Sequence, residues 1–157
     1  HKTALEKMNE LGRRKWEKRV KFTVIRNPWD KVVSHYYYRV QTNQTNLNEN
    51  HLGFRDWVLL TYGGKNTFYF DKPKMFMPQS EWISDEEGKI LVDYICRFEN
   101  LAEDFNALCA KVGKKNSDLP HLKASKRGHY RDYYDADTIR VVGEWFRKDI
   151  ENFGYQF

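Results

Sequence analysis

Phe22-Thr-Val-Ile-Arg-Asn-Pro-Trp-Asp-Lys-Val-Val-Ser34 is the stretch of this sequence that decides its fold. Its first four residues are apolar or β-branched, which is typical of a buried strand. Asn27 then suits the cap of a helix, Pro28 its first position, and Asp30 its first turn, where a carboxylate is favourable. A strand that runs directly into a helix start is a common anion-binding corner. We therefore expect Arg26, at the carboxyl end of the strand, to lie where an anion binds.

The helix that follows carries a second candidate anion ligand. Apolar side chains recur at helical spacing over residues 28–41. Ser34 lies about two turns along this helix, roughly 9–10 Å at 1.5 Å per residue. Its hydroxyl and the guanidinium of Arg26 could therefore converge on one phosphate. The alternative is that Arg26 forms a surface ion pair and that Ser34 is a packing residue of the helix.

Helix and strand patterns alternate along the rest of the chain, which favours an α/β architecture. We predict helices over residues 3–12 and about 136–152, strands over residues 20–26 and 89–96, and a helix that Asn100 caps. The sequence contains neither an internal repeat nor a low-complexity linker, and 157 residues are the size of one ordinary domain.

The composition narrows the possible functions. Hydrophobic residues make up 40% and charged residues 31%, which is typical of a globular protein, and no apolar run approaches the ~18 residues of a membrane span. The formal net charge of +5 favours an anionic partner. Cys96 and Cys109 lie in apolar surroundings, so we predict two buried thiols and no disulfide. The histidines and cysteines lack metal-ligand spacing, and we predict no metal site.

A second group of cations lies in Lys123-Ala-Ser-Lys-Arg-Gly-His-Tyr-Arg131. Arginine forks suit phosphate oxygens, and the glycine permits close approach of the backbone. This segment is either a second anion-binding element or a solvated basic loop. No GxxxxGK[ST] and no GxGxxG motif occurs, so neither common nucleotide-binding loop is present in these residues.

Several segments together resemble one family. Residues 22–36 resemble the 3′-phosphate-binding segment of sulfotransferases, in particular of the carbohydrate branch found in the Golgi and in bacteria. The resemblance continues in family order through Pro78-Gln-Ser-Glu-Trp-Ile83, Val92–Leu101, Leu119–Ser125, Tyr130–Asp135 and Lys148–Tyr155. It implies a P-loop-like, three-layer α/β fold with a central parallel sheet flanked by helices. It also implies sulfuryl transfer from 3′-phosphoadenosine 5′-phosphosulfate (PAPS) to an acceptor hydroxyl, on a carbohydrate, with no metal.

The resemblance assigns roles to the donor-binding residues. Arg26 and Ser34 match the residues that hold the 3′-phosphate of PAPS in that family. The segment Lys126-Arg127-Gly128 matches a basic loop near the same nucleotide, and we expect Arg127 to be an exposed loop charge.

For the residues that would bind and activate the acceptor, the sequence leaves alternatives open. His1 matches a histidine near the acceptor in some relatives and is our candidate general base, the alternative being a base outside these residues. Gln79 and Trp82 lie in a proline-bounded loop that could contact the acceptor or the cofactor, and Tyr130 could stack on a sugar or on adenine. For all three residues the alternative is packing within the fold.

One part of the family pattern is missing from these residues. The family begins with a strand, a phosphosulfate-binding loop of the type Lys-[Thr/Ser]-Gly-[Gly/Ser]-Thr, and a helix. No such loop precedes the first predicted helix. Either the loop was lost together with activity, or residues 1–157 are a single sulfotransferase-like domain that is a fragment of a longer chain. The start at His1 instead of methionine favours the fragment.

Two other classes of function compete with this interpretation. One is a catalytically inactive, sulfotransferase-like module that binds nucleotides or anions. The other is a basic nucleic-acid-binding domain that uses its cationic segments and aromatic side chains. Our prediction is an enzyme without a nucleic-acid partner. The two unpaired cysteines favour the cytoplasm, and the Golgi lumen is the alternative if a membrane anchor precedes His1.

Overall fold

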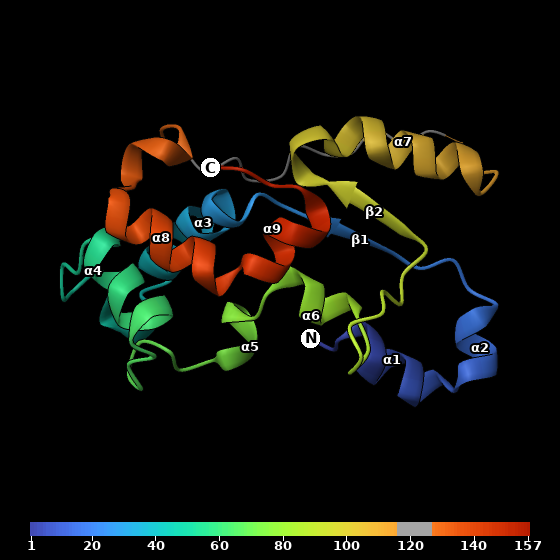
Figure 1. Ribbon diagram of the computed structural model, residues 1–157, viewed down its shortest axis with the longest axis horizontal. Helices are drawn as coiled ribbons and strands as arrows, with labels where there is room; N and C mark the ends of the chain where they lie inside the picture. The colour runs from blue at the N-terminus through green and yellow to red at the C-terminus, as the bar shows by residue number, and fades with distance from the viewer. Residues whose placement is uncertain (116–126) are drawn as a thin grey trace. The chain divides into compact units, whose positions relative to one another are not determined.

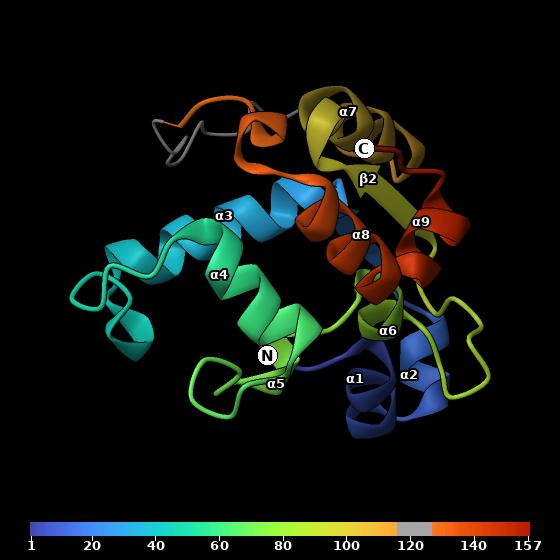
Figure 2. The same cartoon turned by 60° about the vertical axis from the view of Figure 1, so that its left-hand side comes forward.

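The computed structural model describes residues 1–115 and 127–157. They form two compact units, each of which contains two segments of the chain (Figures 1 and 2). The first unit contains His1–Arg26 and the described part of Gln79–Leu122. The second contains Asn27–Pro78 and the described part of Lys123–Phe157. The boundary between Arg26 and Asn27 falls within the strand–helix stretch Phe22–Ser34.

The first unit begins with two short helices, α1 (Ala4–Leu11) and α2 (Arg13–Glu17). Thr3 and Glu6 cap α1 reciprocally, because the Thr3 hydroxyl accepts from the Glu6 N–H and the Glu6 carboxylate accepts from the Thr3 N–H. Gly12 ends α1 with a positive φ of 79°, which a glycine adopts without strain. The helix predicted over residues 3–12 is therefore confirmed within one residue at each end.

A two-stranded parallel sheet lies at the centre of the first unit. β1 (Phe22–Ile25) pairs with β2 (Tyr94–Arg97), with Phe22 opposite Tyr94. Both strands are shorter than predicted. Asp93 and Tyr94 donate their N–H groups to the Lys21 carbonyl, so pairing with β1 begins only there. Earlier in the predicted second strand, Ile90 instead forms an isolated antiparallel bridge with Ser84.

Helices α6 (Gln79–Ile83) and α7 (Leu101–Lys111) complete the first unit, together with the 3₁₀ turn η3 (Phe98–Asn100). The α7 helix runs beside β2 in Figure 1, and the Phe105 ring lies 5.9 Å from the ring of Phe22. Asn100 is the N-cap residue of α7, as predicted, but its side chain makes no capping hydrogen bond. The Asp104 carboxylate in the first turn of α7 accepts from the N–H of Arg97. Cys96 and Cys109 are both free and buried, as predicted.

The second unit is helical among its described residues. Its α-helices are α3 (Pro28–Gln41), α4 (Phe54–Val58), α5 (Pro73–Phe76), α8 (Ala136–Trp145) and α9 (Arg147–Phe153). A π-helical turn, η2 (Leu59–Gly63), continues α4, and the 3₁₀ turns are η1 (Gln44–Asn46) and η4 (Tyr130–Tyr133). In Figure 2, α8 lies beside both α3 and α4. The buried side chains shared by these helices are mostly aromatic or β-branched, and they include Val32, Trp57, Phe76, Val142 and Phe146.

The helix predicted over about residues 136–152 is divided in two. Phe146 leaves helical geometry at φ −99° and ψ 22°, between α8 and α9. Its side chain is fully buried. The break therefore lies at a core residue, where no glycine or proline marked it in the sequence.

The architecture agrees with the predicted α/β class, because the described residues combine helices with a small parallel sheet. In the part of the chain that the structure describes, no helix has both the length and the apolar character needed to cross a membrane.

Candidate functional site

Arg26 follows the carboxyl end of β1, as predicted, and its backbone is held by one side chain. The Gln79 amide accepts a hydrogen bond from the Arg26 N–H at 2.9 Å and donates one to the Arg26 carbonyl at 2.8 Å. The guanidinium carbon lies 4.1 Å from the centre of the Phe98 ring, within the range of a cation–π contact. Gln79, which we predicted to contact the acceptor, therefore fixes the backbone at the candidate phosphate ligand.

The first backbone N–H groups of α3 are already bonded to the capping side chain of Asn27. The Asn27 side chain accepts from the N–H groups of Trp29 at 3.0 Å and Asp30 at 3.4 Å, while Pro28 has no N–H to offer. Asn27 also donates to the carbonyl of Gln156. The predicted cap is thus confirmed, but it occupies the backbone donors that an anion would use at a helix N-terminus. An anion at this corner must be bound by groups other than these N–H donors.

One face of α3 carries three polar side chains in a row. Asp30, Ser34 and Tyr37 are spaced at i, i+4 and i+7, which places them on the same side of a helix. We call these three residues the α3 stripe. Ser34 is half-buried, and its hydroxyl makes no hydrogen bond with a residue that the structure describes. The Ser34 hydroxyl is therefore available to a ligand.

The segment Arg127–Tyr134 docks along the α3 stripe. At one end, Arg127 forms an ion pair with Asp30. At the other end, the Tyr133 ring packs edge-on against the Tyr37 ring at 5.4 Å. Between them, the Gly128 N–H donates to the Tyr133 hydroxyl at 3.1 Å. Arg127 and Gly128 are thus brought to the helix face that carries Ser34.

The Arg127 side chain is not the exposed loop charge that we predicted. Only 9% of its surface is accessible, against 17% for the side chain of Asp30. The reason is a long-range ion pair, between partners 97 positions apart in the sequence, which no local pattern indicates. Lys126, the neighbouring candidate, lies outside the described residues.

Tyrosines surround this ion pair and stay neutral at physiological pH. Burial and a hydrogen bond with Tyr133 raise the pKa of Tyr37 to about 12. Burial raises the pKa of Tyr134 far above its usual value, and its hydroxyl donates to the carbonyl of Trp29 at 2.8 Å. The tyrosines therefore add no charge to that of Arg127 and Asp30.

Two of the three remaining candidates, Trp82 and His1, belong to the first unit. Trp82 lines a cavity of about 380 Å³ in the first unit, beside Trp16, Phe22 and Thr23. This cavity adjoins the amino end of β1, whereas Arg26 follows its carboxyl end. His1 is exposed and precedes α1.

Tyr130 lies in η4 of the second unit. Its ring is 5.8 Å from the ring of Phe157 and 4.7 Å from that of His129. Its hydroxyl accepts from the Arg131 side chain at 3.3 Å. These contacts are those of a packed residue, and an acceptor-binding role for Tyr130 stays a prediction.

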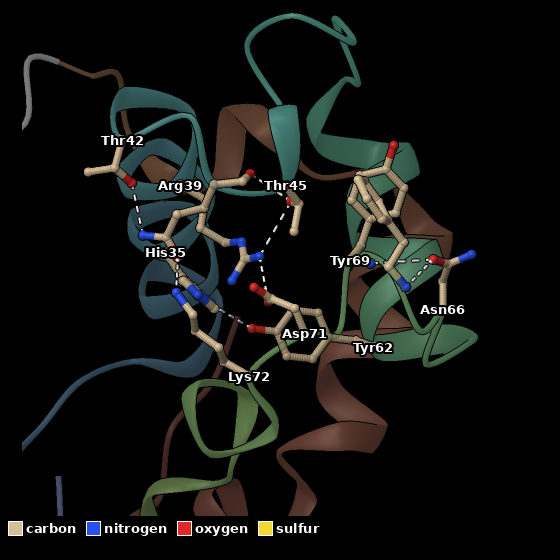
Figure 3. Close-up of polar contacts among 11 residues, drawn as sticks. His35, Arg39, Thr42, Thr45, Tyr62, Asn66, Tyr69, Asp71 and Lys72 are labelled. Atoms are coloured by element: carbon tan, nitrogen blue, oxygen red, sulfur yellow. Dashed lines mark hydrogen bonds and ion pairs between the residues drawn. The ribbon is translucent and has the colours of Figure 1, made fainter.

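A buried polar cluster on the other side of α3 was missed by the sequence analysis. Figure 3 shows His35 and Arg39 extending from α3 towards Tyr62 and Asp71. Arg39 is fully buried and pairs with Asp71 at 2.7 Å, while His35 Nδ1 lies 3.4 Å from the Tyr62 hydroxyl. Burial, reinforced by the nearby charges of Arg39 and Lys31, lowers the pKa of His35 to about 3. His35 is therefore neutral.

His35 is not placed to act on a ligand at the α3 stripe. Its ring packs between the rings of Trp57, at 5.4 Å, and Phe76, at 4.9 Å. The only signal for this cluster in the sequence was Arg39 itself, a charge on the apolar side of a predicted helix. Among the residues that the structure describes, no group of three His, Cys, Asp or Glu side chains could hold a metal ion.

Comparison with known proteins shows a family and a relative. Residues 1–156 match the model of a family described as "Sulfotransferase family". A protein of Archaeoglobus fulgidus, described as an "Uncharacterized protein", is 32% identical over 108 residues, which cover 67% of this chain and 77% of that protein. No solved structure matches.

Proposed function

Since the chain belongs to the sulfotransferase family, we propose that it transfers a sulfuryl group from PAPS to an acceptor hydroxyl on a carbohydrate. We also propose that residues 1–157 belong to one sulfotransferase domain with the P-loop-like, three-layer fold. In the cell we place it in the cytoplasm, with the Golgi lumen as the alternative.

The observation that supports this function best is the arrangement around Ser34. Arg127 and Gly128 dock on the helix face that carries the Ser34 hydroxyl. A guanidinium, a backbone segment at a glycine and a hydroxyl are the groups that bind phosphate oxygens in proteins. In our proposal Ser34, Arg127 and Gly128 bind the 3′-phosphate of PAPS together with Arg26 and Lys126.

The chemistry requires positioning and charge neutralisation more than covalent catalysis. The sulfur–oxygen bond to the leaving phosphate breaks while the acceptor oxygen forms a new bond to sulfur, and a base takes the acceptor proton. We propose His1 as that base. Gln79, Trp82 and Tyr130 are our candidates for contacts with the saccharide, and Gln79 in addition positions the Arg26 backbone.

Calorimetry with adenosine 3′,5′-bisphosphate, the product of the donor, tests the binding step in the full-length protein. We expect Arg26→Ala to weaken binding by about 1.5–3 kcal/mol, because a charge-assisted contact is lost. Arg14→Ala is the matched control, since it removes one exposed positive charge from α2. An unchanged dissociation constant for folded Arg26→Ala would refute the assignment of Arg26.

Turnover of PAPS and competition with oligonucleotides separate the alternatives. An inactive binding module would bind the bisphosphate but release none from PAPS with any acceptor. A nucleic-acid-binding domain would bind oligonucleotides with a steep salt dependence, and the bisphosphate would not compete. The net charge of +5 fits either partner, so competition decides between them.

A further inference from the structure

Asp30 lies on the α3 stripe itself, one helical turn before Ser34. Its carboxylate forms an ion pair with the Arg127 guanidinium, and both side chains are largely withdrawn from solvent. An ion pair in such surroundings fixes its partner more firmly than an exposed pair does. Arg127 is thereby tied to the helix that carries the candidate phosphate ligand.

The guanidinium of arginine is a planar fork with five N–H donors, which can serve two acceptors at once. The Nη2 group of Arg127 donates to Asp30 Oδ1. We propose that Asp30 is a positioning residue for the sulfuryl donor: it holds the fork of Arg127 on the Ser34 side of α3, and the fork is shared between this carboxylate and the 3′-phosphate. This inference rests on the proposed function.

Two opposing effects decide whether loss of the Asp30 charge weakens or strengthens phosphate binding. A carboxylate near a phosphate repels it, so loss of the charge would strengthen binding if repulsion dominated. The charge of Asp30 is, however, compensated by the guanidinium bound to it. A long arginine side chain also loses rotamer freedom when it is immobilised, and Asp30 removes that freedom before the ligand binds. We therefore expect positioning to dominate.

The test is a double-mutant cycle in the full-length protein, read as the dissociation constant of adenosine 3′,5′-bisphosphate. We expect Asp30→Asn to weaken binding about tenfold in the wild-type background and by less than about twofold in the Arg127→Ala background. Asp30→Glu, which keeps the carboxylate, should restore most of the affinity. Adenosine 5′-monophosphate, which lacks the 3′-phosphate, should bind Asp30→Asn and wild type within about twofold of each other.

Asp137→Asn is the matched control. It changes the net charge equally and breaks an exposed ion pair with Arg55 in the same unit, so bisphosphate affinity should stay within about twofold. Thermal melts of each variant establish that it is folded.

Each of the following results would overturn the inference. Tighter binding by Asp30→Asn would show that the carboxylate competes with phosphate. An equal loss in both backgrounds, or an equal loss for the monophosphate, would show a purely structural role. A wild-type protein that binds no bisphosphate would refute the proposed function itself, whereas normal binding by wild type and by Asp30→Asn alike would refute the role of Asp30 only.

Discussion

Removal of the Asp71 carboxylate should destabilise the second unit strongly. Arg39 is fully buried, and Asp71 at 2.7 Å is the acidic partner of its guanidinium. Among the residues that the structure describes, the Nε and Nη1 atoms of Arg39 have no hydrogen-bond partner, and Nη2 donates to Thr45 Oγ1 only at 3.4 Å. In Asp71→Ala the buried positive charge would lose its compensation.

The expected cost follows from burial. Loss of one partner of a buried ion pair typically costs 3–5 kcal/mol. The Asp71 side chain is 29% accessible, so water partly screens the pair, and we expect the lower end, about 3 kcal/mol. Arg39→Met should cost less than Asp71→Ala, because the apolar replacement leaves no buried charge and Asp71 can be hydrated.

Urea unfolding of wild type and variants measures these differences. Glu144→Ala is the control, since its ion pair with Arg140 has side chains 65% and 62% accessible and should contribute no more than about 0.5 kcal/mol. If Asp71→Ala costs as little as the control, or less than Arg39→Met, the argument from an uncompensated buried charge is wrong.

Three further variants test individual side chains. Arg127→Ala should lower bisphosphate affinity and also cost about 1–3 kcal/mol of stability in urea, because it removes an ion pair whose two side chains are largely shielded from solvent; a loss of stability alone would mark Arg127 as purely structural. Ser34→Ala should weaken bisphosphate binding by about 0.5–1.5 kcal/mol, as loss of a neutral donor does, and a calorimetric constant equal to wild type would exclude the hydroxyl. The folded-state pKa of His35, about 3, lies below its usual 6.5, so the unfolded chain binds more protons than the folded protein between these pH values, and stability falls as the pH is lowered from 6.5 towards 3. His35→Phe should remove the His35 contribution to this loss of stability. Parallel curves of stability against pH for wild type and His35→Phe would contradict the prediction.

The start of α3 could be predicted because its determinants are local. Asn27, Pro28 and Asp30 are adjacent residues whose preferences for a helix start agree with one another, and the helix occupies the predicted residues 28–41. The same reasoning places Asn100 correctly at the N-cap of α7, but it does not predict that the Asn100 side chain makes no capping hydrogen bond there.

The contacts at the candidate site could not be predicted, because their partners are far apart in the sequence. Gln79 lies 53 positions from Arg26, and Arg127 lies 97 positions from Asp30. Sequence patterns suggested an acceptor contact for Gln79 and solvent exposure for Arg127. In the fold, the Gln79 amide instead bonds to the Arg26 backbone after β1, and Arg127 forms an ion pair with Asp30 on α3.

The most direct test of the proposed function is PAPS turnover by the full-length protein. The assay follows release of adenosine 3′,5′-bisphosphate with and without a panel of neutral and acidic saccharides, and mass spectrometry detects the sulfated product. We predict bisphosphate release that depends on a saccharide, with a mass gain of one sulfuryl group on that saccharide, and its loss in Arg26→Ala but not in Arg14→Ala. Binding of the bisphosphate without release from PAPS in the presence of any acceptor would contradict the transferase and support an inactive binding module.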